Sequence, residues 1–132
     1  MGMNNRSFWI ISILLFALGC HETPYVQGKR LYEANCQNCH MEDGSGLNNL
    51  VPALSQSPIL GHASMACTIR YGKRDTLWQD QTFLLKEMPN HKSLSATEIA
   101  NIVNYVNKSW FSDFKEFTII EVEDALKNCE HK

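Results

Sequence analysis

Two cysteines and a histidine stand close together in Cys36-Gln37-Asn38-Cys39-His40. This C-x-x-C-H spacing is typical of covalent haem attachment, because thiols that far apart lie on one helical turn and can add to the two vinyl groups of one porphyrin. The adjacent imidazole is then placed to bind the iron. The sequence therefore predicts one covalently attached haem c, bound through Cys36 and Cys39, with His40 as the proximal ligand.

A C-x-x-C pair also occurs in thioredoxin-like redox sites and as half of a zinc site. A thioredoxin-like site would need a preceding strand, whereas the sequence on both sides of the motif looks helical. A zinc site would need a second ligand pair at similar spacing, but Cys67 and Cys129 each stand alone. Haem attachment is the preferred interpretation.

The ligand on the other face of the iron decides the function, because it sets the reduction potential and determines whether a coordination position is open. Met88 is the best candidate, since it lies far beyond His40 in the polar stretch 86–92, where a methionine is not needed to fill a core. A thioether suits haem iron and gives a higher potential than a second histidine. The rival ligands are His62, Met65 and His91.

The residues around the motif resemble class I cytochromes c, over roughly residues 26–110. Gly28 and Tyr32 precede Cys36 at the offsets where that family has a glycine and an aromatic residue in contact with its C-terminal helix. The resemblance implies an all-α cytochrome c fold, in which about three to five helices wrap round one covalently bound haem.

The resemblance also implies roles for residues near the haem. The carbonyl of Pro52 would accept a hydrogen bond from the ring N–H of His40, which orients the imidazole. Leu54 would pack on the porphyrin. Met88 and Pro89 stand just before the last helix of the domain, where class I cytochromes c place a Met-Pro distal ligand.

Two helices are predicted to position these groups. The first covers residues 26–35, with Thr23 and Pro24 able to cap and open it. The second begins at a capping box over residues 95–98, and its apolar residues recur at helical spacing to residue 110. By the resemblance, Tyr105 is the aromatic residue where the two helices cross.

Residues 1–19 have the pattern of an export signal. Arg6 precedes an apolar run over residues 8–18, which is shorter than the roughly twenty residues of a permanent membrane-spanning helix. The following Gly19-Cys20 resembles a bacterial lipoprotein cleavage site, so Cys20 would become a lipid-modified first residue. The alternatives are a buried core helix and secretion with Cys20 free.

The residues after position 110 predict a further helix. Thr118 and Glu121 form a second capping box. The positions that share one face of this helix are Ile119, Val122, Ala125, Leu126 and Cys129. An amphipathic helix has to bury such a face, so we expect it to pack back on the domain.

Cys67 and Cys129 are the thiols left without a role. An oxidising compartment favours pairing them, and we predict a disulfide between the two. Two buried free thiols are the alternative.

The chain of 132 residues has a net charge of −2, which does not fit the strongly basic surface of a nucleic-acid binder. Its length allows one globular domain, and its apolar content disfavours intrinsic disorder. We expect a lipoprotein signal peptide over 1–19, a short tether over 20–24, a cytochrome c domain over 25–110 and a C-terminal helical extension over 111–132 that packs on the domain.

If His40 and Met88 both bind the iron, no coordination position is open for a substrate, and no other set of catalytic groups stands out in the sequence. The sequence therefore predicts a one-electron carrier and not an enzyme. We expect it to be a lipoprotein of the bacterial cell envelope, facing the periplasm or otherwise extracytoplasmic. The alternatives are a haem-containing accessory subunit of a larger complex and a gas-sensing or peroxidase-like haem protein with an open distal site.

The expected partners are redox proteins, namely a reductase or a terminal oxidase complex, and the membrane through the lipid anchor. No nucleic acid and no small-molecule substrate is expected. Lys86 and Lys92 flank Met88 and would steer an acidic partner. The residues that could bond the haem propionates are Arg70, Tyr71, Lys73 and Trp78, and their spacing does not choose among them.

Overall fold

The computed structural model describes residues 25–48, 50–79 and 82–129. The predicted export signal, the lipidation site at Cys20 and the tether lie outside the described residues. Thr23 and Pro24, the predicted cap of the first helix, also lie outside them.

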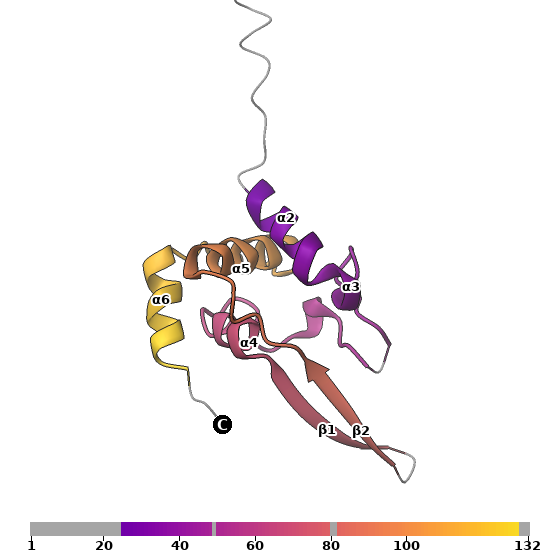
Figure 1. The fold of residues 1–132 in the computed structure, drawn as a ribbon. Coiled ribbons are helices and arrows are strands. Elements are labelled where there is room, and N and C mark those ends of the chain that lie inside the picture. The colour runs from indigo at the N-terminus through magenta and orange to yellow at the C-terminus, as the bar shows by residue number, and fades with distance from the viewer. Residues whose placement is uncertain (1–24, 49, 80–81, 130–132) are drawn as a thin grey trace, which may run out of the picture.

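The described residues form five α-helices, one short 3-10 helix and a two-stranded hairpin. Figure 1 shows the helices gathered together, with the hairpin extending away from them. This mainly helical architecture confirms the predicted fold class. The elements are α2 (Val26–Asn35), α3 (Gln37–His40), η1 (Leu54–Gln56), α4 (Met65–Tyr71), β1 (Lys73–Gln79), β2 (Thr82–Met88), α5 (Ala96–Trp110) and α6 (Ile119–Lys127).

The helices α2 and α5 cross at Gly28, which is buried. A Cβ atom on Gly28 would collide with the backbone carbonyl of Asn101 and would lie 2.7 Å from the Cβ of Tyr105. Only a glycine lets the two backbones approach so closely. The Tyr32 ring lies one turn further along α2, with its centroid 5.4 Å from that of Tyr105 and 5.3 Å from that of Trp110. The contacts expected of Gly28, Tyr32 and Tyr105 are thereby confirmed.

The ends of these helices follow local sequence signals. The capping box that opens α5 is formed: the Ser95 hydroxyl accepts a hydrogen bond from the Glu98 N–H, and the Glu98 side chain accepts one from the Ser95 N–H. The predicted range of α2 is confirmed as Val26–Asn35, but its N-cap is Tyr25 and makes no side-chain capping bond.

The helix α5 is the centre of the core and contacts α2, α4 and α6. Its buried apolar side chains are Ile99, Ile102, Val103 and Val106. None of the described helices is long and apolar enough to cross a membrane. The predicted haem site is thus built round α5.

The segment after α5 returns to the core through one buried side chain. The Asn104 amide donates a hydrogen bond to the Phe117 carbonyl and accepts one from the Phe117 N–H, both at 2.9 Å. The predicted capping box of Thr118 and Glu121 then opens α6. Val122 is fully buried, whereas Ile119 is 44% exposed. The buried face of α6 is therefore narrower than predicted. It does not include Ile119, which is the first residue of the helix.

The hairpin was not expected from the sequence. The strands β1 and β2 pair antiparallel from Lys73 opposite Met88 to Gln79 opposite Thr82. Gly72 ends α4 with a φ of +76°, a conformation that L side chains rarely adopt, and the chain turns there into β1. Met88 is consequently the last residue of a strand, which the polar stretch 86–92 did not predict.

The structure brings Cys67 of α4 and Cys129, just beyond the end of α6, together. Their Sγ atoms are 2.14 Å apart and their Cα atoms 5.6 Å apart, the Cα separation being one that a disulfide requires. Such a bond would close a loop with a sequence separation of 62 residues. The chain-entropy relation gives a stabilisation of about 4 kcal/mol for a loop of that length.

We expect this disulfide in the native protein isolated without reductant. Alkylation of the unfolded protein without reductant should leave Cys67 and Cys129 unlabelled in the mass spectrum, and prior reduction should make both reactive. Labelling of both residues without reductant would show that they are free thiols.

Candidate haem site

A cavity of about 490 Å³ lies between the C-terminal end of α2, α3, the segment around η1, α4, the base of the hairpin and α5. Its volume falls in the range of sites for small molecules and cofactors. Much of its wall is apolar. The apolar side chains of the wall include Leu54, Ile59, Leu60, Met65, Ile69, Ile102 and Val106. The cavity therefore suits a large and mainly apolar group.

The C-x-x-C-H motif forms the junction of α2 and α3. Cys36 ends α2, where its N–H donates to the Tyr32 carbonyl at 2.8 Å, and the His40 N–H donates to the Cys36 carbonyl at 2.9 Å. The Tyr32 hydroxyl donates to the Met41 carbonyl at 2.6 Å. The motif is thus held from both sides by Tyr32, which itself is buried at the crossing of α2 and α5.

Both cysteines of the motif line the cavity and carry free thiols. Burial, and then the neighbouring Cys39, raise the pKa of Cys36 to about 11, because a low-dielectric environment disfavours the thiolate. Cys39 is exposed. The two thiols needed for attachment therefore line the same cavity, Cys36 from the junction of α2 and α3 and Cys39 from within α3.

His40 lines the same cavity and is half-buried. Burial lowers the pKa of its imidazole below the ordinary value, which favours the neutral form that binds metals. Its Nδ1 atom is buried and has no hydrogen-bond partner among the described residues. A buried polar atom without a hydrogen-bond partner carries a free-energy cost.

The predicted hydrogen bond between His40 and Pro52 is not formed. Pro52 lines the cavity, but its carbonyl oxygen lies against Gly46, 2.8 Å from the position that a Cβ would occupy there. The structure therefore shows no hydrogen bond from His40 to Pro52, because Nδ1 of His40 has no partner among the described residues. Leu54 does line the cavity and packs against the core, with its N–H bonded to the Gly44 carbonyl at 2.8 Å.

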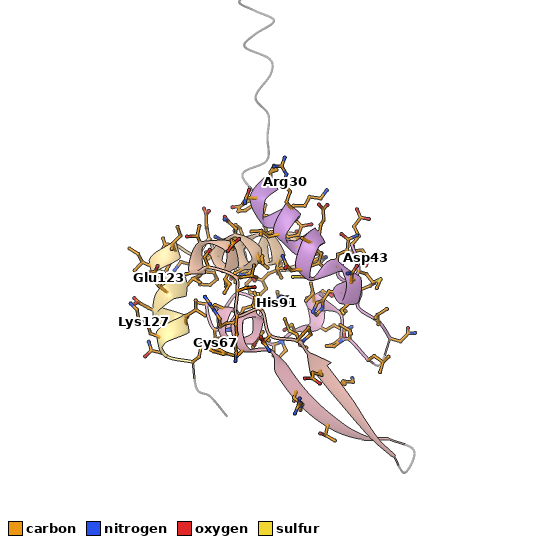
Figure 2. All side chains as sticks on the ribbon, in the orientation of Figure 1. Arg30, Asp43, Cys67, His91, Glu123 and Lys127 are labelled. Carbon is orange, nitrogen blue, oxygen red and sulfur yellow. A yellow bond between two sulfur atoms is a disulfide. The ribbon has the colours of Figure 1, made fainter. Side chains whose placement is uncertain are left out.

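The candidate distal ligands are separated by their positions. Met88, at the end of β2, lines the cavity and packs against the core, and His91 and Met65 also line it. His62 is exposed and is not part of the wall. Figure 2 shows His91 beside α4, where its N–H donates to the Ile69 carbonyl at 3.1 Å.

Charged side chains gather where the hairpin meets the cavity. Lys73 and Lys86 are part of the cavity wall, and Lys73 pairs with Asp75 at 2.9 Å. Arg70 and Tyr71 do not line the cavity. Of the predicted propionate-binding residues, Lys73 thus lies nearest to the site, while the side chain of Trp78 lies outside the described residues.

The residues present fit a covalently attached haem. One mainly apolar cavity of sufficient size is lined by two thiols, by the neutral imidazole of His40 and by the thioether of Met88. One nitrogen of that imidazole has no hydrogen-bond partner among the described residues. Within the part of the chain that the structure describes, no three His, Cys, Asp or Glu side chains converge where they could hold a metal ion. The zinc alternative therefore has no site there.

Sequence reasoning missed the apolar wall opposite the motif. Ile59 and Leu60 follow a proline in a short apolar run, and Met65 and Ile69 lie at helical spacing in α4. These patterns are visible in the sequence. They did not reveal that both segments fold against the motif.

The similarity of this chain to known proteins agrees with this site. The chain is 32% identical over 88 residues to "Alcohol dehydrogenase (quinone), cytochrome c subunit" of Gluconobacter oxydans (strain 621H), covering 63% of this chain and 18% of that protein. The subunits of the same description from Gluconacetobacter polyoxogenes and Komagataeibacter europaeus are 31% identical over 99 residues, covering 70% of this chain and 20% of theirs. The chain thus spans about a fifth of the length of these relatives.

A family model also matches most of the domain. The model described as "Cytochrome C oxidase, cbb3-type, subunit III" aligns with residues 23–106, a range that contains the motif, the cavity wall and Met88. Membership implies haem c as the cofactor and electron transfer as the function. The chain therefore belongs to the cytochrome c family that this model describes.

Proposed function

We propose that the protein is a one-electron carrier with a single haem c, attached through Cys36 and Cys39 and bound axially by His40 and Met88. The observation that carries this proposal is that His40 of α3 and Met88 of β2, far apart in sequence, lie in the wall of one apolar cavity together with the two free thiols. When bound, the haem supplies an iron that takes up and releases one electron.

The protein's own residues limit what that iron can do. If His40 and Met88 both held the iron, no coordination position would be open for a small-molecule substrate, and the protein would transfer electrons without being an enzyme. The apolar wall excludes water.

We further propose that Cys20 carries a lipid anchor and that the protein works on the extracytoplasmic side of a bacterial membrane. The support is the pattern of residues 1–19, since c-type haem is attached outside the cytoplasm. Acyl chains each contribute about 0.8 kcal/mol per buried methylene, so a multiply acylated Cys20 would hold the domain at the membrane without a spanning helix.

The partners we propose are membrane-associated redox complexes, either a reductase or a terminal oxidase. The relatives are described as cytochrome c subunits of quinone alcohol dehydrogenases, which favours a second form of the same function, as a fixed subunit of such a complex. Lys86 in the cavity wall and the exposed Lys92 would face an acidic partner in either case.

Replacement of Cys36 and Cys39 together by alanine should abolish covalent attachment, because both thioether bonds are lost. Haem staining of the denatured protein on a gel should be positive for the wild type and for a Cys67→Ser control, and negative for the double variant. Haem that stays with the denatured double variant would contradict attachment at these residues. Wild-type protein should contain one haem per chain.

Replacement of Met88 by leucine should open the distal position while keeping the side-chain volume. The oxidised wild type should show the long-wavelength charge-transfer band of a thioether ligand, and the variant should lose it and have a lower reduction potential. The reduced variant should bind carbon monoxide rapidly, and the reduced wild type should not. Rapid binding by the wild type would instead favour a gas-sensing or peroxidase-like protein with an open site.

Replacement of Cys20 by serine should release the protein from the membrane without changing its haem content. Fractionation of the cells should move the variant from the membrane pellet to the soluble extracytoplasmic fraction, whereas a Ser12→Ala control should remain in the pellet. A Cys20→Ser variant that still resists extraction from the membrane would show that another element anchors it.

A further inference from the structure

The position of Met88 cannot be set by strand pairing alone. Met88 is the last residue of β2 and pairs with Lys73, the first residue of β1. A two-stranded hairpin without further support is only marginally stable in water, and this one extends away from the helices (Figure 1). A ligand carried at its base needs a second point of attachment.

That attachment is the last turn of α4. The Ile69 carbonyl accepts the His91 N–H at 3.1 Å, and the Arg70 guanidinium donates through Nη1 to the Lys92 carbonyl at 3.0 Å. The backbone that follows Met88 is therefore bonded twice to α4. The helix is itself held by contacts with α5 and α6 and by the link from Cys67 to Cys129.

Gly72 makes the closest contact. A Cβ atom there would collide with the Met88 carbonyl oxygen and would lie 3.0 Å from the carbonyl carbon of Pro89 and from the nitrogen of Asn90. The φ of +76° at this position also favours glycine. The backbone of Met88 thus rests directly on the backbone of Gly72, with no side chain between them.

We propose that Gly72 and Arg70 are positioning residues for Met88, and that the last turn of α4 clamps residues 88–92 so that the thioether faces the haem cavity. This inference rests on the proposed function, in which Met88 binds the iron. Arg70 does not line the cavity. It can therefore affect the iron only by holding the backbone of residues 88–92, through its hydrogen bond to the Lys92 carbonyl.

The test uses the full-length haem protein and a matched pair of variants. Gly72→Ala should lose the long-wavelength charge-transfer band and have a lower reduction potential. Gly61→Ala makes the same change at a φ of +75°, where the added Cβ would meet the Phe111 ring, away from Met88. It should be destabilised while keeping the band and the potential.

Arg70→Ala is a milder second variant that remains informative if Gly72→Ala does not fold. Added imidazole competes with the thioether for ferric iron, so a weaker clamp should raise its apparent affinity by about tenfold, the change expected from losing one charge-assisted hydrogen bond. Arg70→Lys can still donate to the Lys92 carbonyl and should restore most of the wild-type value.

The results separate the two proposals. A wild-type protein without the band, or a Met88→Leu variant that keeps it, would overturn ligation by Met88. A wild type with the band and a Met88→Leu variant without it, combined with wild-type band, potential and imidazole affinity in Gly72→Ala and Arg70→Ala, would overturn the clamp alone. If Gly72→Ala does not fold, an imidazole affinity of Arg70→Ala equal to that of the wild type overturns the proposed clamp.

Discussion

The close crossing of α2 and α5 is the contact on which the rest of the structure depends. Because Gly28 has no side chain, the two backbones meet, and Tyr32 packs between Tyr105 and Trp110. The Tyr32 hydroxyl then bonds the Met41 carbonyl beyond the motif. The crossing therefore fixes the end of α2, and with it the direction in which the C-x-x-C-H motif faces. A larger residue at Gly28 would separate the helices and move the motif relative to α5.

The chemistry of the site follows from burial of polar groups in an apolar wall. Desolvation lowers the pKa of His40 and raises that of Cys36, so both groups are kept neutral. Neither change needs a charged neighbour as its main cause. The same burial leaves Nδ1 of His40 without a hydrogen-bond partner among the described residues. The surrounding fold thus keeps the His40 imidazole in the neutral form that binds metals.

The two halves of the cavity are stabilised differently. The half that carries the motif is held by helix packing and by the hydrogen bonds of Tyr32. The half that carries Met88 stands at the base of a hairpin and is held by backbone contacts with α4. Patterns among residues close together in the sequence predict the helices of the half that carries the motif. The half that carries Met88 depends on the turn at Gly72 and on pairing between β1 and β2. This difference explains why the helices α2 and α5 were predicted correctly while the hairpin was not.

The sequence by itself determined the attachment motif, the ranges of α2 and of the start of α5, and the two capping boxes, because each depends on residues a few positions apart. It also determined the positions of Gly28, Tyr32 and Tyr105 at the crossing, through resemblance to a known family. Only the tertiary structure decided the direction of the Pro52 carbonyl, the exposure of Ile119 and which candidate ligands reach the cavity. These three features depend on contacts between segments that are far apart in the sequence. Patterns among neighbouring residues do not encode how such distant segments pack together.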